Sequence, residues 1–471
     1  MIKIIFGVFF TVFLLISVMV VLYWRDINFD PRTLDLAIFF GLLPIAITAL
    51  LVMPFVIKNW LKEQQQKKEK ALQNEDIPLE NTQPLEPVQW INLNVFSAYS
   101  LSSQGEDAAI LEKIKSYESP ELDPELLNSY GLPILSFRIP DLDAEEDPDS
   151  DFGNKRQSRI HQLIAQQLEQ QTDVLWSVGE HLKKSALFYD TQLIQEYRMH
   201  PAWIDPQAST GDSEDYQPQV QQVSRLSQLK IHIILPGELL HIWDETSTQE
   251  LIADYLNQLG YVAQVFHVEH HYWGGEIAYS EWIDLLKQIE LDNFSVSLVI
   301  IADSEIDQDT IDEKIWVSEQ YIPAEYISSV CISKPDQIID DLIPVKQLKI
   351  AKNAPSLKEI SKDINFAHQT IIENEQPFIM LLDDISQFKN LKKIEQNFSN
   401  LQIEQQHYLM MYQSVGQTQS LSKIFGFNLA LQFPEDFISM VYTIQSPDVQ
   451  TFIQQYQHQE SEVNHEKQHN I

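Results

Sequence analysis

The chain opens with two long apolar runs that carry no charged side chain. The first covers residues 4 to 24, and a short polar stretch separates it from the second, which covers residues 36 to 57. Each run is long enough to cross about 30 Å of hydrocarbon at about 1.5 Å per helical residue. Pro44 and Pro54 lie in the second run, where neighbouring helices can satisfy the backbone groups that proline leaves unpaired. The pattern predicts that residues 1 to 60 form a two-helix transmembrane anchor, with membrane lipid as its partner.

The competing interpretation of the first run is a cleaved signal peptide, whose apolar part is usually about 7 to 15 residues long. The run here is longer, and no small-x-small motif precedes the second run, so we expect both helices to remain in the protein. Several lysines follow the second run, at Lys58, Lys62, Lys67, Lys68 and Lys70. Because cytoplasmic flanks are rich in lysine and arginine, we expect a multi-pass protein of the bacterial inner membrane whose large domain is cytoplasmic.

Beyond the anchor, the pattern changes to that of a linker and then to that of a folded domain. Residues 61 to 88 are polar and contain three prolines, which is typical of a solvated helix followed by a stiff linker. From residue 89 to residue 456, β-branched apolar runs alternate with segments of helical periodicity, which predicts an α/β architecture. Residues 457 to 471 have no core pattern and are expected to form a disordered polar tail.

Individual elements can be assigned from the same pattern. We expect strands at 90–96, 230–235, 261–268 and 296–301, and helices at 105–116, 249–259 and 279–289.

Composition narrows the function classes. The chain is 44% hydrophobic and 10% aromatic, which is typical of a globular protein. Its 68 acidic and 32 basic residues give a formal net charge of -36, so nucleic acid would be repelled and is excluded as a partner. The only cysteine is Cys331, which excludes an internal disulfide framework and a cysteine-rich metal site.

Histidines gather in one short segment, where His267, His270 and His271 flank Glu269. Imidazole and carboxylate groups are common Zn²⁺ ligands, so this segment is a candidate metal site. Its spacing differs from HExxH, however, and the sequence fixes no fourth ligand. The preferred interpretation is therefore a set of ordinary strand-end histidines, and we expect neither a metal nor a cofactor.

Two further motifs have similarly plain interpretations. Asp303, Glu305, Asp307 and Asp309 alternate as in a calcium loop, but the glycine that permits the sharp turn is missing. We expect a solvated acidic turn after a strand. The glycine pair at 274–275 lacks the other glycines and the lysine of a phosphate-binding loop, and it predicts a simple turn.

Three parts of the chain resemble the β-ketoacyl synthases of the thiolase-like superfamily. The sequence VGQTQ at 415–419, followed by a helical segment at 420–431, is similar to the late segment in which these enzymes carry a catalytic histidine. The strand at 297–303 and the later IPAE at 322–325, leading into a strand at 326–333, are similar to two neighbouring segments of the family. The region from 96 to 140 resembles its first strand, helix and loop. The resemblance covers residues 89 to 456 and implies a duplicated thiolase-like α/β fold and a homodimer.

The positions at which such synthases hold their catalytic groups carry other residues here. Ketosynthase chemistry needs a cysteine thiolate and two histidines. The resemblance puts the nucleophile near Trp273, the first histidine near Asp383 and the second at Gln417, and a glutamine amide does not titrate near neutral pH. Cys331 lies far from the first of these positions in an apolar strand. Three replacements in three roles indicate a pseudoenzyme with no catalytic residues.

Two classes of function follow. The first is a non-catalytic scaffold or accessory protein with protein partners in a bacterial envelope complex. The layout resembles that of anchored accessory proteins encoded with type VI secretion systems, although no shared motif supports the comparison. The alternative is an acyl-group-binding protein, or an acyltransferase-like enzyme with a rebuilt active site at the turn of residues 271–276 or at Asp383.

Overall fold

The chain divides into two compact units, Met1–Leu85 and Glu86–Ile471. The structure, a computed structural model, describes residues 87–140, 142, 155–190, 192–203, 223–315, 321–340, 342–354, 378–382, 408–410, 421–434, 437–443, 446 and 448–456, together with scattered residues between 13 and 43. The expected transmembrane runs, the segment at 61–86 and the tail at 457–471 fall wholly or almost wholly outside the described residues. Among the residues that are described, no helix combines the length and the apolar character needed to cross a membrane.

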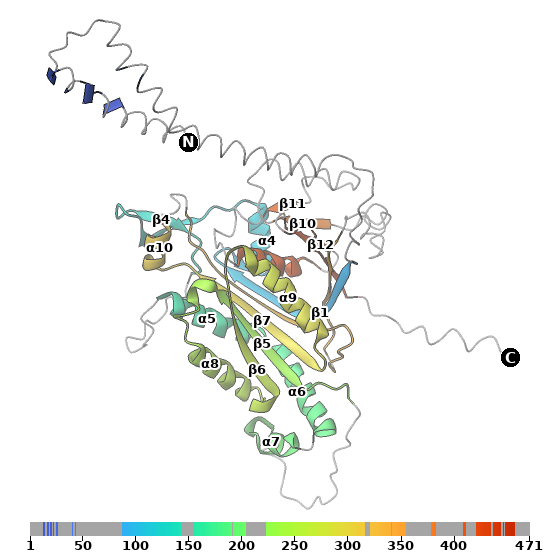
Figure 1. Cartoon of the computed structure of the whole chain (residues 1–471). Helices are drawn as coiled ribbons and strands as arrows, with labels where there is room; N and C mark the ends of the chain where they lie inside the picture. Colours follow the sequence, from blue (N-terminus) through green and yellow to red (C-terminus); the bar gives the residue numbers. More distant parts are fainter. Residues whose placement is uncertain are drawn as a thin grey trace, which may run out of the picture. The chain divides into compact units, whose positions relative to one another are not determined.

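An 11-stranded mixed sheet forms the centre of the second unit (Figure 1). Its strands are β1 (Gln89–Ser102), β2 (Gly105–Glu106), β5 (Gln228–Pro236), β6 (Phe266–Trp273), β7 (Ser295–Ser304), β8 (Glu325–Ser333), β9 (Lys346–Lys352), β10 (Phe378–Leu382), β11 (Tyr408–Met410), β12 (Ile438–Tyr442) and β13 (Gln450–Gln455). A separate two-stranded sheet pairs β3 (Glu121–Leu127) with β4 (Pro133–Ser136).

The large sheet consists of two halves that are wound in the same way. The first half has the strand order β1-β8-β7-β5-β6 and the second half has the order β9-β13-β12-β10-β11. If the five strands of each half are numbered along the chain, their order across the sheet is first, fifth, fourth, second, third in both halves. The fifth strand is antiparallel to both of its neighbours, whereas the second, third and fourth are parallel. The halves meet where β1 pairs antiparallel with β9. The expected mixed α/β fold with two similar halves is confirmed.

Helices cover both faces of the sheet. One face packs against α4 (Ala108–Lys115), α9 (Ala278–Leu291) and α14 (Ser422–Leu429), and the other against α5 (Lys155–Gln170), α6 (Thr172–Tyr189) and α8 (Glu245–Gln258). We call these the α9 face and the α5 face. The other described helices are α7 (Leu193–Met199) and α10 (Gln308–Ile315), and 3-10 turns occur at η2 (Pro201–Trp203), η3 (Gly237–Leu239), η4 (Ala263–Val265), η5 (Gly275–Ile277) and η7 (Ala430–Gln432).

The central strands are buried on both sides, which explains their composition. Every residue of β7 (SVSLVIIADS) and of β8 (EYISSVCIS) is buried. Side chains alternate between the faces of a strand. Val299 and Ile301 accordingly belong to the core of the α9 face, and Leu298 and Ile300 to that of the α5 face. Continuous β-branched runs of this kind are typical of strands that helices cover from both sides.

One predicted strand was wrong in position. The apolar run at 261–268 follows a turn and contains η4, and the strand β6 begins only at Phe266. The apolar character of the run has another cause, because Tyr261, Val262 and Val265 are buried in the core of the α5 face. The hydroxyl of Tyr261 also donates a hydrogen bond of 2.6 Å to the carbonyl of Leu175 in α6. Tertiary packing here produced an apolar run without a strand.

Candidate functional site

A tight turn connects β6 to α9 at the place where the resemblance implied a nucleophile. The strand ends at Trp273, and Gly274 and Gly275 lead through η5 into the helix. Trp273 is 7% exposed and packs in the core of the α9 face. Gly275 has a φ of 61°, a left-handed conformation that glycine adopts without strain. An indole offers no thiolate, so Trp273 cannot form an acyl intermediate.

The thiol of Cys331 does not substitute for a nucleophile at this turn. Cys331 is completely buried in the middle of β8. Burial raises the pKa of its thiol to about 12, so the group is protonated near neutral pH. Its side chain packs in the core of the α5 face, whereas Trp273 packs in the core of the α9 face. The sheet therefore separates the only thiol of the chain from the turn.

The other two degenerate positions lie outside the described residues. β10 ends at Leu382, one residue before Asp383, and Gln417 falls in the gap before α14. Their assignment as replaced histidines stays a prediction.

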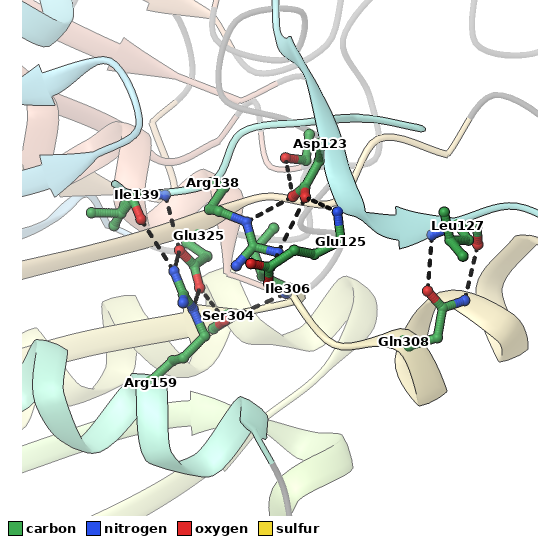
Figure 2. A network of polar contacts seen from close by, with 11 residues as sticks. Asp123, Glu125, Leu127, Arg138, Ile139, Arg159, Ser304, Ile306, Gln308 and Glu325 are labelled. Carbon is green, nitrogen blue, oxygen red and sulfur yellow. Dashed lines mark hydrogen bonds and ion pairs between the residues drawn. The ribbon is translucent and has the colours of Figure 1, made fainter. Parts of the chain in front are cut away.

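Polar side chains converge instead around the start of β8 (Figure 2). Glu325 is fully buried, and its Oε2 accepts hydrogen bonds from Arg159 Nη2 at 2.8 Å and from the Ile139 backbone N–H at 2.9 Å. Its Oε1 accepts from the Ser304 hydroxyl at 2.6 Å and pairs with Arg159 Nε. Arg159 also donates to the Ile139 carbonyl at 3.1 Å. The network ties α5, β7 and β8 together, with the carboxylate matched by a guanidinium.

A second ion pair lies beside this network and closes the small sheet (Figure 2). Asp123 Oδ2 accepts from Arg138 Nε at 2.8 Å and from the Ser136 hydroxyl at 2.9 Å. Its Oδ1 accepts from the Glu125 backbone N–H at 3.0 Å. Burial alone would raise the pKa of Asp123, but the hydrogen bonds from Arg138, Glu125 and Ser136 outweigh it and hold the pKa below the usual range. Asp123 is therefore ionised, and it holds β3 against β4.

This pair lines a cavity of about 340 Å³. Its wall includes Ser103, Lys113, Glu118, Asp123, Glu125 and Arg138. Ligand pockets for apolar molecules are lined mainly by hydrophobic and aromatic side chains. The wall also includes Leu122, Phe137 and three prolines, so its lining mixes charged and apolar side chains and does not select between a polar ligand and an acyl chain.

The acidic residues at the end of β7 form a third cluster and correct an expectation. Asp303 and Glu305 are 2% and 1% exposed, so they do not form a solvated acidic turn. Asp303 Oδ1 accepts from Arg156 Nη2 at 3.0 Å, and Glu305 pairs with Lys314 of α10. Burial, followed by the charge of Asp303, raises the pKa of Glu305 to about 7. These carboxylates turned inward because cations from α5 and α10 meet them there.

The remaining acidic positions do not form a calcium loop either. Asp307 accepts hydrogen bonds of 3.1 Å from the backbone N–H and the hydroxyl of Thr310, as a residue before a helix does. Asp309 lies in the first turn of α10.

The histidines that the sequence singled out lie on both faces of β6. Because side chains alternate along a strand, His267, Glu269 and His271 share the α9 face with Trp273, and His270 points to the α5 face. Burial lowers the pKa of His271 and of His270. The three histidines therefore do not converge on one point.

Sequence reasoning missed the cations that neutralise the buried acids. Arg156 and Arg159 are buried in α5, a helix that was not predicted, and Lys314 lies in α10. A signal was present in the sequence, because Arg156 and Arg159 occupy the same helical face as apolar Ile160 and Leu163. Basic residues at core positions of an amphipathic helix indicate buried acidic partners.

Known proteins resemble the chain in structure only. No protein-family profile matches it, and no curated protein matches its sequence. A ketosynthase from module 6 of the bacillaene synthase of Bacillus subtilis is 8% identical over 78% of this chain and 72% of that chain, with a TM-score of 0.42. Cerulenin-bound OleA of Xanthomonas campestris is 8% identical over 78% and 99%, with a TM-score of 0.29. The tetronic acid condensing enzyme AbyA1 is 10% identical over 49% and 76%, with a TM-score of 0.27. Because these scores are low, we base the fold on the strand order.

Proposed function

We propose that this chain is a membrane-anchored, non-catalytic protein with a thiolase-like body, which serves as a scaffold or accessory protein of a bacterial envelope complex. One observation carries the proposal. Trp273 occupies the turn where the nucleophile is expected, and the only thiol is buried on the opposite face of the sheet. An acyl-transfer reaction of the ketosynthase type has no thiolate from which to start.

A turnover assay tests the loss of chemistry. Full-length protein in detergent would be incubated with an acyl thioester and a malonyl thioester, and condensation and thioester hydrolysis would be followed together. We expect neither activity above a protein-free control. Condensation that Cys331→Ala abolishes would overturn the proposal. Hydrolysis that this variant retains would favour a rebuilt active site.

The proposed anchor has a separate test. A reporter fused after Glu75 follows the lysine-rich segment beyond the second apolar run, and positive charge opposes translocation. We expect activity from a reporter that works in the cytoplasm and none from alkaline phosphatase. Strong alkaline phosphatase activity would contradict the cytoplasmic placement of the domain.

A second copy of the chain is the first protein partner that we propose. In the sheet formed by the described strands, β6 is paired only with β5, so its outer backbone groups are open to pairing with another strand. Cross-linking of the membrane-bound protein, followed by purification and mass spectrometry, would identify both a homodimer and other envelope proteins. A monomer without cross-linked partners would contradict the scaffold role.

A further inference from the structure

A second group of titratable side chains lies on the α9 face of the first half, away from the ion pairs around β8. It joins His232 of β5 to Glu269 and His271 of β6. The parallel register sets His232 beside Glu269 and Ile234 beside His271, which brings the three side chains together. His232 is 4% exposed, and the side chains of His271 and Glu269 are 22% and 39% exposed.

The spacing of their ligand atoms is that of a metal site. His232 Nδ1 lies 3.0 Å from His271 Nε2 and 3.5 Å from Glu269 Oε2. The third side of the triangle, from His271 Nε2 to Glu269 Oε2, is 3.9 Å. Ligand atoms about 2.0 to 2.2 Å from a tetrahedral Zn²⁺ ion lie about 3.3 to 3.6 Å apart. The three measured distances bracket this value, so a single ion can reach all three atoms with small side-chain movements.

The partners of Glu269, which is partly exposed, set this cluster apart from the buried acids around the start of β8. Among the ion pairs of the described residues, its carboxylate meets only imidazoles, including His267 Nε2 at 3.5 Å. Lys230, the nearest basic residue along β5, pairs with Asp292. The imidazoles of His232, His267 and His271 thus surround the carboxylate of Glu269, which pairs with no lysine or arginine among the described residues. A divalent cation would supply positive charge beside this carboxylate.

The buried imidazole of His232 is only partly satisfied within the protein. Its Nδ1 shares one hydrogen bond with His271, while its Nε2 is buried and has no hydrogen-bond partner in the part of the chain that the structure describes. Buried polar atoms normally have partners. Coordination of an ion through Nδ1 would place the ring proton on Nε2 and would give the buried side chain a strong interaction at Nδ1.

We propose that His232, Glu269 and His271 bind a divalent transition-metal ion, with Zn²⁺ as the ion that the ligand set fits best. Two imidazoles and one carboxylate are a ligand set of zinc sites that keep an open coordination position. The partial exposure of Glu269 and His271 leaves that position to water or to a ligand atom of a bound partner. The ion would also fasten the edge strand β6 to β5.

The experiment compares two histidines of the same strand. Full-length protein in detergent would be stripped with EDTA, dialysed and titrated with Zn²⁺ against a chromophoric chelator, and the bound metal would be counted by mass spectrometry. His271→Ala removes a proposed ligand, whereas His270→Ala removes its neighbour on the opposite face. Both variants retain the histidines of the tail, so binding there cancels in the comparison.

We expect wild type and His270→Ala to bind one more tight Zn²⁺ ion than His271→Ala. The affinity of this site should fall at least about 100-fold in His271→Ala, since even residues that only orient ligands cost 10- to 100-fold. Co²⁺ bound to wild type should give the intense visible absorption of a tetrahedral site, and His232→Ala should lose it while circular dichroism confirms folding. Equal Zn²⁺ binding by His270→Ala and His271→Ala, or no tight ion in wild type, would overturn the proposal.

Discussion

Two clusters of polar side chains in the same half of the sheet are built in opposite ways. Around the start of β8, each buried carboxylate meets a guanidinium or an ammonium group, as Glu325 meets Arg159 and Asp303 meets Arg156. On β5 and β6, the carboxylate of Glu269 pairs only with imidazoles among the residues that the structure describes. The first cluster is neutralised by the protein itself and holds the fold together. The second has a partly exposed carboxylate that lacks a cation and is suited to receive one, so the partners of a carboxylate distinguish a structural network from a binding site.

The largest effect should follow the loss of a cation from the neutralised cluster. Arg159→Ala would leave Glu325, which is fully buried, without its guanidinium. Breaking a buried pair in this way typically costs about 3 to 5 kcal/mol of unfolding free energy. Urea denaturation of the variant and wild type would measure the difference.

A matched control sharpens this prediction. Arg138→Ala removes a pair at the rim of the network, where the side chain of Arg138 is 18% exposed, and should cost less, about 2 kcal/mol. The double variant Arg159→Met, Glu325→Gln replaces both partners of the pair. It should be more stable than the single variant Arg159→Ala. Equal costs for the two arginines, or a loss below about 1 kcal/mol for Arg159→Ala, would break the comparison.

A pH effect should distinguish Glu305 from Asp123, whose pKa is held below its usual range. Burial and the charge of Asp303 raise the pKa of Glu305 from 4.5 to about 7. Between these values the folded protein holds a proton that the unfolded chain has lost, so wild type loses stability as the pH rises through this window. Glu305→Gln cannot ionise, and from pH 5 to pH 8 it should gain about 2 kcal/mol relative to wild type. Parallel stability curves for the two proteins would show that Glu305 is already ionised at pH 5.

A smaller effect is expected on the histidine side of the comparison. In metal-free protein, His271→Ala removes one hydrogen bond of a partly exposed side chain and should cost about 1 kcal/mol or less. The variant should differ from wild type far more in Zn²⁺ affinity than in stability. A loss as large as that of Arg159→Ala would mean that the histidines are a structural network as well.

Cys331 belongs to neither cluster, so its substitution serves as a reference. It gives the unfolding free energy that is lost when a small buried side chain is shortened. It is completely buried and packs among apolar residues of the α5 face. Cys331→Ala should cost about 1 kcal/mol, as expected for the loss of a small buried group, and should leave Zn²⁺ binding unchanged. Thermal and urea unfolding would measure the cost, and a change in Zn²⁺ affinity would argue against the assignment of the metal site.

The fold was more predictable from the sequence than the site. Buried β-branched runs such as those of β5 and β7 have few alternatives, and their alternation with helices gave the α/β class. The run at 261–268 failed because apolar residues also pack in turns. The helix α5 was not predicted. The arginines of this helix, which neutralise Asp303 and Glu325, were therefore missed as well.

The site depends on pairings that a one-dimensional pattern does not contain. His232 and His271 are 39 residues apart, and only the parallel register of β5 and β6 brings His232 Nδ1 to 3.0 Å from His271 Nε2. The sequence therefore pointed to His270 as readily as to His271, although the two face opposite sides of the strand. By contrast, the absence of a cysteine near Trp273 could be read directly, because the identity of a residue needs no tertiary information.

The central proposal, that this duplicated α/β fold has no thiolate for ketosynthase-type chemistry, has one direct measurement. Full-length protein would be incubated with an acyl thioester or a cerulenin-like electrophile, and its intact mass would be determined. Because burial keeps Cys331 protonated and inaccessible, we predict an unmodified mass under native conditions and labelling only after unfolding. A stoichiometric adduct on Cys331 of the folded protein would contradict the account and identify an active site in the middle of β8.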